Sequence, residues 1–201
     1  MDPKDDAGVS RRDFLKTVGV AGAAVGVTGM VPSETAEGAA IVGPGAVPIT
    51  LTINGRTHKL EVEPRVTLLD AVRNRLNMTG VKRVCDRGAC GSCTMIVDER
   101  TVYACSMLAI EAQGKQIRTI EGLSDESGAL HPVEQSFVEH DALMCGFCTP
   151  GFVTATAALL EKNPNPTPEE VQRALDGNIC RCGTYKRVLE AALSTKGVRR
   201  G

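Results

Sequence analysis

Eight cysteines stand out in this 201-residue chain, and two of them are separated by a single residue in the stretch N-I-C-R-C-G-T-Y, residues 178–185. A disulfide between Cys180 and Cys182 would close a cramped ring and strain its own geometry. Sulfurs this close together suit metal binding better. A count of eight fits either a disulfide framework in a secreted protein or a set of metal ligands, so the spacing of the other six must decide.

The first four cysteines follow the pattern C-x4-C-x2-C, with a fourth cysteine after eleven more residues. This is the spacing with which plant-type ferredoxins hold a [2Fe-2S] cluster. In the loop C-D-R-G-A-C-G-S-C, Gly88 and Gly91 can adopt positive φ and let backbone N–H groups point at the cluster. Such donors raise the reduction potential of an anionic cluster. The predicted ligands of this first site are Cys85, Cys90, Cys93 and Cys105.

The other four cysteines form the pairs C-G-F-C and C-R-C. Zinc is the obvious alternative for a C-x2-C pair, but structural zinc sites usually repeat a C-x2–4-C knuckle, which a C-x-C partner fits poorly. A cluster with two irons can take one pair on each iron. Four disulfides in an exported protein would leave the ferredoxin spacing a coincidence. The predicted ligands of this second site are Cys145, Cys148, Cys180 and Cys182.

Alternating apolar residues predict a sheet that would hold the first site. The strands I-T-L-T-I and K-L-E-V flank Asn54-Gly55, which is a type I′ turn signal, so residues 49–62 are expected to form a β-hairpin. A helix should follow, because Thr67 is a good N-cap and Asp70 stands where a reciprocal acid is found. Its apolar residues recur on one face, which predicts that the helix crosses the sheet.

A second hairpin is predicted from residues 94–97 and 101–104, around a turn at residues 98–100. Residues 116–120 read as a closing strand. The order hairpin, helix, hairpin, strand is an α+β plan with a helix on one face of a small mixed sheet. Since Cys105 leaves the far end of the second hairpin, folding of the sheet would assemble the first site.

Helical periods replace the strand pattern after Gly122. Pro132 and Pro150 each open a predicted helix, because proline is tolerated in the first helical turn. Thr167 caps a third helix, and a fourth follows Tyr185 with apolar residues at helical spacing. Four short helices predict a small bundle after the sheet domain.

Composition argues against a nucleic-acid partner. Hydrophobic content of 42% is ordinary for a soluble globular protein. Aromatic content is only 3%, with no Trp, so there is no stacking platform for single-stranded nucleic acid. The net charge of -1 removes the electrostatic case for a phosphate backbone. No nucleic-acid partner is therefore expected.

The N-terminal segment S-R-R-D-F-L-K precedes an apolar run at residues 18–31. A helix needs about 20 apolar residues to span a bilayer, so no stable membrane span is expected. Arg11 and Arg12 ahead of a mildly hydrophobic run resemble a twin-arginine export signal. Residues 1–40 are interpreted as this signal and a disordered leader, with cleavage near residue 38 or 40. That pathway carries folded proteins, often with a cofactor installed, which implies a periplasmic location.

Two sequences that flank the second set of cysteines carry a family resemblance. M-C-G-F-C-T-P-G, residues 144–151, and G-N-I-C-R-C-G-T-Y, residues 177–185, follow the ferredoxin-like motif. Together they resemble the small iron–sulfur subunit of the molybdenum hydroxylases, the xanthine oxidase family. The resemblance implies an N-terminal β-grasp, plant-type ferredoxin domain over residues 47–123 and a C-terminal all-α four-helix bundle over residues 130–195. It also implies one [2Fe-2S] cluster in each domain.

The resemblance implies where the second set of cysteines lies. Cys145 and Cys148 would stand at the N-terminus of the helix opened by Pro150, where the dipole and free N–H groups favour thiolate. Cys180 and Cys182 would lie in the turn before the fourth helix and close the opposite side of the cluster. By analogy with the family, the sulfur of Cys182 would also touch a molybdopterin held by a separate large subunit.

One position departs from the family pattern. The family commonly has Gln just before the C-G-F/Y-C pair, where its amide contacts the pterin, and this chain has Met144. That hydrogen bond is therefore not expected here. Met144 is interpreted as a core residue that packs against Phe147, because methionine fills irregular gaps readily.

The function implied by the resemblance is electron transfer within an exported molybdenum enzyme that oxidises an aldehyde or hydroxylates an N-heterocycle. Electrons would pass from a large molybdopterin-binding subunit through the two clusters to a FAD subunit or a c-type cytochrome. The spelling C-R-C-G-T-Y is closer to a branch of which some members use cytochrome c. No catalytic residue is predicted in this chain. The alternatives are a freestanding two-cluster ferredoxin-like shuttle and a zinc-stabilised adaptor, which copurification and metal analysis would separate.

Overall fold

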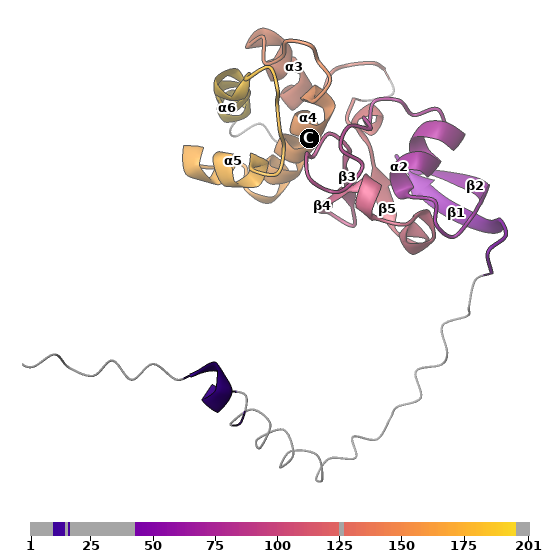
Figure 1. Ribbon diagram of the computed structural model, residues 1–201. Coiled ribbons are helices and arrows are strands. Elements are labelled where there is room, and N and C mark those ends of the chain that lie inside the picture. The colour runs from indigo at the N-terminus through magenta and orange to yellow at the C-terminus, as the bar shows by residue number, and fades with distance from the viewer. Residues whose placement is uncertain (1–9, 15, 17–42, 125–126, 196–201) are drawn as a thin grey trace, which may run out of the picture. The chain divides into compact units, whose positions relative to one another are not determined.

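The computed structural model describes residues 10–14, 16, 43–124 and 127–195. The chain divides into two compact units, residues 1–41 and residues 42–201. In the first unit, residues 11–14 form one helical turn. The apolar run of the expected export signal and its candidate cleavage points lie outside the described residues. The second unit carries the sheet, the longer helices and all eight cysteines (Figure 1).

A five-stranded mixed sheet forms the N-terminal part of the second unit, in the strand order β2-β1-β5-β3-β4. β1 and β5 pair in parallel, and the other neighbours pair antiparallel. Because β5 lies between β1 and β3, it joins the two hairpins into one sheet. The strands are β1 (Val47–Ile53), β2 (Arg56–Val62), β3 (Thr94–Val97), β4 (Arg100–Tyr103) and β5 (Gln116–Arg118).

The first hairpin is confirmed, since β1 and β2 pair antiparallel along their whole length. Asn54 and Gly55 have φ angles of 51° and 75°, as a type I′ turn requires. The Asn54 side chain has a second task, because its Oδ1 accepts a hydrogen bond from Thr119 N and its Nδ2 donates to Thr119 Oγ1, both at 2.9 Å. β5 therefore ends at Arg118, and the prediction of a strand up to residue 120 was too long.

The second hairpin turns over two residues, not over the predicted three. Asp98 and Glu99 form the turn, with φ angles of 45° and 65°, and Arg100 already belongs to β4. Two acidic residues are unusual where both φ angles are positive, since such turns favour Asn-Gly. Asp98 compensates in part, because its carboxylate accepts hydrogen bonds from Gln116 N at 2.9 Å and from Lys115 Nζ at 3.3 Å. These contacts also lower the pKa of Asp98.

The helix after β2 begins as predicted and then changes type. Thr67 Oγ1 accepts a hydrogen bond from Asp70 N at 3.2 Å, which confirms the N-cap. The Asp70 carboxylate turns elsewhere: it accepts a hydrogen bond from Asn74 at 3.0 Å and pairs with Arg83. A wider π turn follows, which apolar spacing does not reveal. The two segments are α2 (Leu68–Asp70) and the π-helix η1 (Ala71–Arg75).

Helices α3 to α6 form the C-terminal part and share a second hydrophobic core. Prolines stand in the first turns of α3, α4 and α5, as predicted. The cap of α5 is confirmed as a capping box between Thr167 and Glu170. α4 also packs against β3, which joins the helices to the sheet (Figure 1). The helices are α3 (Pro132–Glu139), α4 (Thr149–Lys162), α5 (Pro168–Leu175) and α6 (Tyr185–Ser194).

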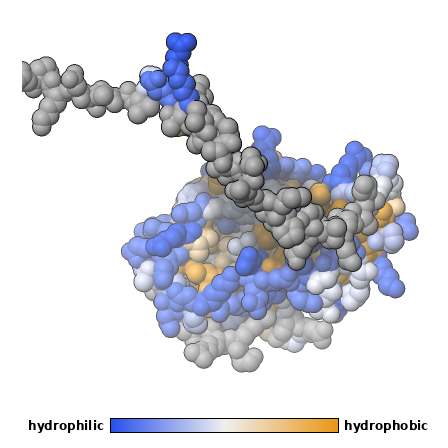
Figure 2. Space-filling model, turned by 90° about the horizontal axis from the view of Figure 1, so that it is seen from below, coloured by the Kyte–Doolittle hydropathy of each residue, from blue (hydrophilic) through white to orange (hydrophobic). Residues whose placement is uncertain are grey.

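The remaining short helices connect these elements. Among the residues that the structure describes, no helix is long and apolar enough to cross a membrane. On the face drawn in Figure 2, hydrophobic residues appear in patches between hydrophilic ones. The 3-10 helices are η2 (Ala104–Ser106), η3 (Ala109–Ala112) and η4 (Ile120–Gly122).

Candidate iron–sulfur centres

The first site combines a loop with the end of a hairpin. Cys85, Cys90 and Cys93 lie on the loop before β3, and Cys105 lies in η2, directly after β4. The hairpin brings η2 back to the loop, since Ala104 N donates a hydrogen bond to Cys93 O at 3.3 Å. Cys85 is half-buried and the other three cysteines are buried. The structure thus brings Cys105 to the loop that carries the other three cysteines, as we expected from the folding of the sheet.

Backbone N–H groups point at two of these sulfurs. Gly88 N donates to Cys105 Sγ at 3.2 Å, and Ala89 N donates to Cys85 Sγ at 3.3 Å. Gly88 has a φ of 69°, in the left-handed region that glycine adopts readily. Gly91 has the same φ, but its carbonyl is the group that accepts hydrogen bonds inside the loop. The positive φ expected at both glycines is confirmed, and N–H groups of this loop do point at cysteine sulfurs.

The thiol pKa values of the first site diverge. Burial would raise the pKa of Cys85, but hydrogen bonds from the backbone of Arg87 and Ala89 outweigh it and lower the pKa to about 7. Burial raises the pKa of Cys93 to about 12, and the adjacent Cys105 thiol adds to the rise. A metal must displace the proton of a thiol ligand. Metal binding here therefore releases protons and is favoured as pH rises.

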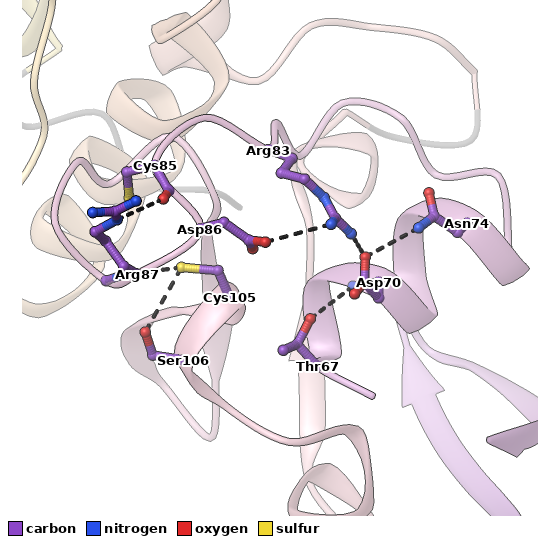
Figure 3. A network of polar contacts seen from close by, with 10 residues as sticks. Thr67, Asp70, Asn74, Arg83, Cys85, Asp86, Arg87, Cys105 and Ser106 are labelled. Carbon is purple, nitrogen blue, oxygen red and sulfur yellow. Dashed lines mark hydrogen bonds and ion pairs between the residues drawn. The ribbon is translucent and has the colours of Figure 1, made fainter. Parts of the chain in front are cut away.

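A polar network ties the first site to helix α2 (Figure 3). Arg83 lies between two carboxylates, because it pairs with Asp70 and its Nη1 lies 3.4 Å from Asp86 Oδ2. Arg87 Nε donates to the carbonyl oxygen of Cys85 at 3.2 Å. Arg87 thus holds the backbone beside the first sulfur, and Arg83 joins Asp86, which follows Cys85, to Asp70 of α2.

The second site lies where α4 begins and before α6 begins, as predicted. Cys148 is the N-cap residue of α4, and Cys145 precedes it in the loop. Cys180 and Cys182 lie in the turn that leads to α6. Cys180 is buried and Cys148 half-buried, whereas Cys145 and Cys182 are exposed. The sulfur of Cys180 lies 3.1 Å from Thr184 Oγ1.

The thiolate preference expected at the start of α4 stays a prediction for a metal-bound Cys148, and burial opposes it. Burial raises its pKa to about 12, and the neighbouring Cys180 adds to the rise. For Cys180, burial acts in the same direction, but hydrogen bonds from the Thr184 hydroxyl and backbone outweigh it and lower the pKa to about 7. Burial thus makes the Cys148 thiol harder to ionise than the Cys180 thiol.

The interpretation of Met144 as a core residue is wrong. The side chains of Met144 and Phe147 are 65% and 48% exposed. Both precede α4 in a loop that turns at Gly146, where φ is 77°, so neither shares the apolar face of the helix. Leu143 is exposed as well. These three residues give the surface around the exposed Cys145 an apolar character.

The donor sets fit a two-iron cluster better than a single ion. Within the described residues, no group of three or more His, Cys, Asp or Glu side chains is arranged to hold one metal ion. A structural zinc site would need four ligands around one ion. In a [2Fe-2S] cluster each iron takes only two protein ligands, so the four sulfurs need not converge on one ion. The N–H donors at Cys85 and Cys105 also match what stabilises an anionic cluster.

A backbone hydrogen bond joins the two sites. Ile179 N donates to the carbonyl oxygen of Cys90 at 2.9 Å, and Ile179 directly precedes Cys180. Asn178, to which no pattern in the sequence assigns a role, is only 5% exposed at the same place. A single sequence gives no signal for such a contact between distant loops.

Comparison with known proteins assigns a domain to each site. Residues 51–122 match the 2Fe-2S iron-sulfur cluster binding domain, and residues 119–193 match the [2Fe-2S] binding domain. The nicotine 6-hydroxylase small subunit of Paenarthrobacter nicotinovorans is 47% identical over 151 residues, which is 75% of this chain and 90% of that subunit. The chain belongs to the small iron–sulfur subunits of the molybdenum hydroxylases.

Other comparisons agree with membership among the small iron–sulfur subunits. The aldehyde oxidoreductase iron-sulfur-binding subunit PaoA of Escherichia coli K12 is 39% identical over an alignment of 210 positions that covers 96% of this chain and 90% of that subunit. The crystal structure of quinoline 2-oxidoreductase from Pseudomonas putida 86 matches 74% of this chain and 91% of its own chain, with a TM-score of 0.71 and 40% identity. Residues 8–28 match the twin-arginine translocation pathway signal sequence, which confirms the predicted signal.

Proposed function

We propose that this chain is the electron-transfer subunit of an exported, molybdopterin-dependent oxidoreductase. Related proteins are named as subunits of a nicotine 6-hydroxylase and an aldehyde oxidoreductase, and a related structure is a quinoline 2-oxidoreductase. The substrate of the complete enzyme would accordingly be an N-heterocycle or an aldehyde. The chain itself would make and break no substrate bond.

The two sets of cysteines would hold two [2Fe-2S] clusters, which supply one-electron redox chemistry when bound. The first cluster would belong to a β-grasp ferredoxin domain over residues 47–123. The second would belong to a four-helix bundle over residues 130–195. The proposed ligands are Cys85, Cys90, Cys93 and Cys105 for the first cluster, and Cys145, Cys148, Cys180 and Cys182 for the second.

The observation that carries this proposal is the hydrogen bond from Ile179 N to Cys90 O. It links a residue next to one proposed ligand with another proposed ligand, so the two sites are in contact inside the molecule. Each site also has a cysteine that reaches the surface, Cys85 in the first and Cys182 in the second. A chain that conducts electrons between two partners needs both features: the two sites must contact each other, and each site must be accessible from the surface.

The surface supports a large molybdopterin-binding subunit as the partner at the second site. Leu143, Met144 and Phe147 expose apolar surface next to Cys145, and exposed apolar patches mark interfaces that are buried in an assembly. The exposed Cys182 would contact the pterin. A FAD subunit or a c-type cytochrome would accept electrons at the first site. The export signal supports a periplasmic location for the complex.

Cysteine variants in the complex, purified without air, test this function. Cys180→Ser should abolish the electron paramagnetic resonance signal of the second cluster. It should also lower the iron content by about half, because each cluster carries the same number of irons. Cys85→Ser should do the reverse. Thr184→Ser is the matched control, since it keeps a hydroxyl beside the Cys180 sulfur and should keep both signals. Protein that is free of iron, or Cys180→Ser protein with both signals intact, would contradict the proposal.

A further inference from the structure

Three glycines from distant segments meet where the two sites adjoin. Gly91 lies in the cysteine loop of the first site, Gly151 in the first turn of α4, and Gly177 shortly before Cys180. A Cβ atom on any of the three would collide with a neighbouring segment. The backbones at this contact therefore approach more closely than any other residue type would permit.

The buried amide of Asn178 lies at the centre of this contact. A Cβ on Gly91 would stand 2.6 Å from Asn178 Nδ2 and 2.6 Å from Gly177 O, and real Cβ atoms essentially never come within 3.0 Å of another heavy atom. A Cβ on Gly151 would collide with Gly91 O and stand 3.0 Å from Asn178 Nδ2. On Gly177 it would collide with the hydroxyl of Tyr103. The three glycines therefore leave no room for a Cβ atom where the two loops meet.

The Asn178 amide bonds the loop of one site to the loop of the other. Its Nδ2 donates to Gly91 O at 3.0 Å and approaches Thr94 Oγ1 at 3.4 Å, although Gly91 is 87 positions away in the sequence. Thr94 Oγ1 donates to the same carbonyl at 2.6 Å. The side chain is 5% exposed, so water cannot replace the amide without opening the contact.

We propose that Asn178 is the positioning residue that fixes the separation between the two cluster sites. It stands two residues before Cys180, and the carbonyl that it binds lies between Cys90 and Cys93. One side chain thus ties together backbone next to proposed ligands of both clusters. The inference rests on the proposed function, because the separation matters only if electrons pass between the sites. Electron tunnelling slows steeply with distance, so a small opening of this contact has a large effect on the rate.

The test uses the complete complex with its partner subunits and the variants Asn178→Ala and Asn178→Asp. The first removes the amide, and the second presents an oxygen to the Gly91 carbonyl in place of an N–H donor. The matched control is Asn165→Ala, because Asn165 is exposed and only its backbone N–H bonds to another residue. Gly151→Ala perturbs the same contact from the side of α4.

Three measurements report on the separation without relying on turnover. In the fully reduced complex, magnetic coupling between the clusters splits their paramagnetic resonance signals, and this splitting should narrow in both Asn178 variants. Electron transfer between the two clusters, followed after flash photoreduction, should slow. Hydrogen exchange at Ile179 N, which bonds to Cys90 O, should become faster. The control Asn165→Ala should match the natural protein in all three.

The outcomes distinguish a failure of the positioning role of Asn178 from a failure of the proposed electron-transfer function. Asn178 variants with both cluster signals, unchanged splitting and unchanged transfer would overturn the positioning role. Loss of a cluster in both Asn178 variants and in Gly151→Ala would also overturn it, because the contact would then serve to hold a cluster. If the natural complex contains only one kind of cluster, the proposed function fails before any variant is made.

Discussion

The exposed phenylalanine at the second site is a residue that the folded chain does not need for its own core. Phe147 and Met144 lie beside the exposed Cys145, and their apolar side chains face solvent in the isolated chain. Large aromatic side chains often dominate the binding free energy of an interface. At the scale of one residue, the affinity for the large subunit should therefore depend on Phe147 more than the stability of the fold does.

The substitution Phe147→Asp should weaken binding of the large subunit by about 2 kcal/mol, a roughly 30-fold rise in Kd. Iron content should stay unchanged. Val84→Asp is the matched control, because Val84 is 54% exposed but lies in the loop of the first site. Affinity is measured by titrating the large subunit against each variant. Equal affinities for both variants would contradict an interface at Phe147.

Residue types predicted the chemistry of this chain better than they predicted its contacts. The cysteine spacing alone divided the proposed ligands into two sets, and each set falls within one of the two matched 2Fe-2S domains. Met144 was misplaced because apolar character does not tell whether a loop residue faces the core or a partner. Asn178 was missed because its partner, Gly91, lies 87 positions away. A single sequence does not predict contacts between residues so far apart in the chain.

At the scale of elements, the two hairpins show how well residue types predict a turn. Asn54-Gly55 was recognised as a turn because both residues accept positive φ. Asp98-Glu99 adopts the same kind of turn. Its residue types do not predict such a turn, so the turn was predicted one residue too long. The π turn of η1 was missed for a related reason, since apolar spacing does not distinguish it from an α-helix.

Glu99 should be a weak point of the second hairpin. A non-glycine residue in the left-handed region costs about 1–2 kcal/mol, and Glu99 has a φ of 65°. Glu99→Gly relieves that strain but adds freedom to the unfolded chain, so we expect a net gain of about 0.5–1 kcal/mol. Glu99→Ala keeps a Cβ and should gain nothing. Urea unfolding measures both, and an equal midpoint for the two variants would rule out backbone strain.

At the scale of the whole molecule, the two hydrophobic cores are distinct, but both lie within one compact unit, residues 42–201. α4 supplies side chains to the second core and also packs against β3 of the sheet. The glycine contact adds a second connection, because Gly151 of α4 lies against the carbonyl of Gly91. The sequence suggested two domains from a change of periodicity, and periodicity contains no information about how tightly the parts join.

Unfolding of the cluster-loaded chain should therefore be one cooperative transition. The sheet cannot open without exposing the side of β3 that α4 covers, so the two cores stabilise one another. Gly151→Val should lower the free energy of unfolding by about 1–3 kcal/mol, because its Cβ would collide with Gly91 O. Gly45→Val is the matched control, since nothing lies within 4 Å of the Cβ position there. Calorimetry without air that resolves two transitions in the natural chain would show that the cores unfold independently.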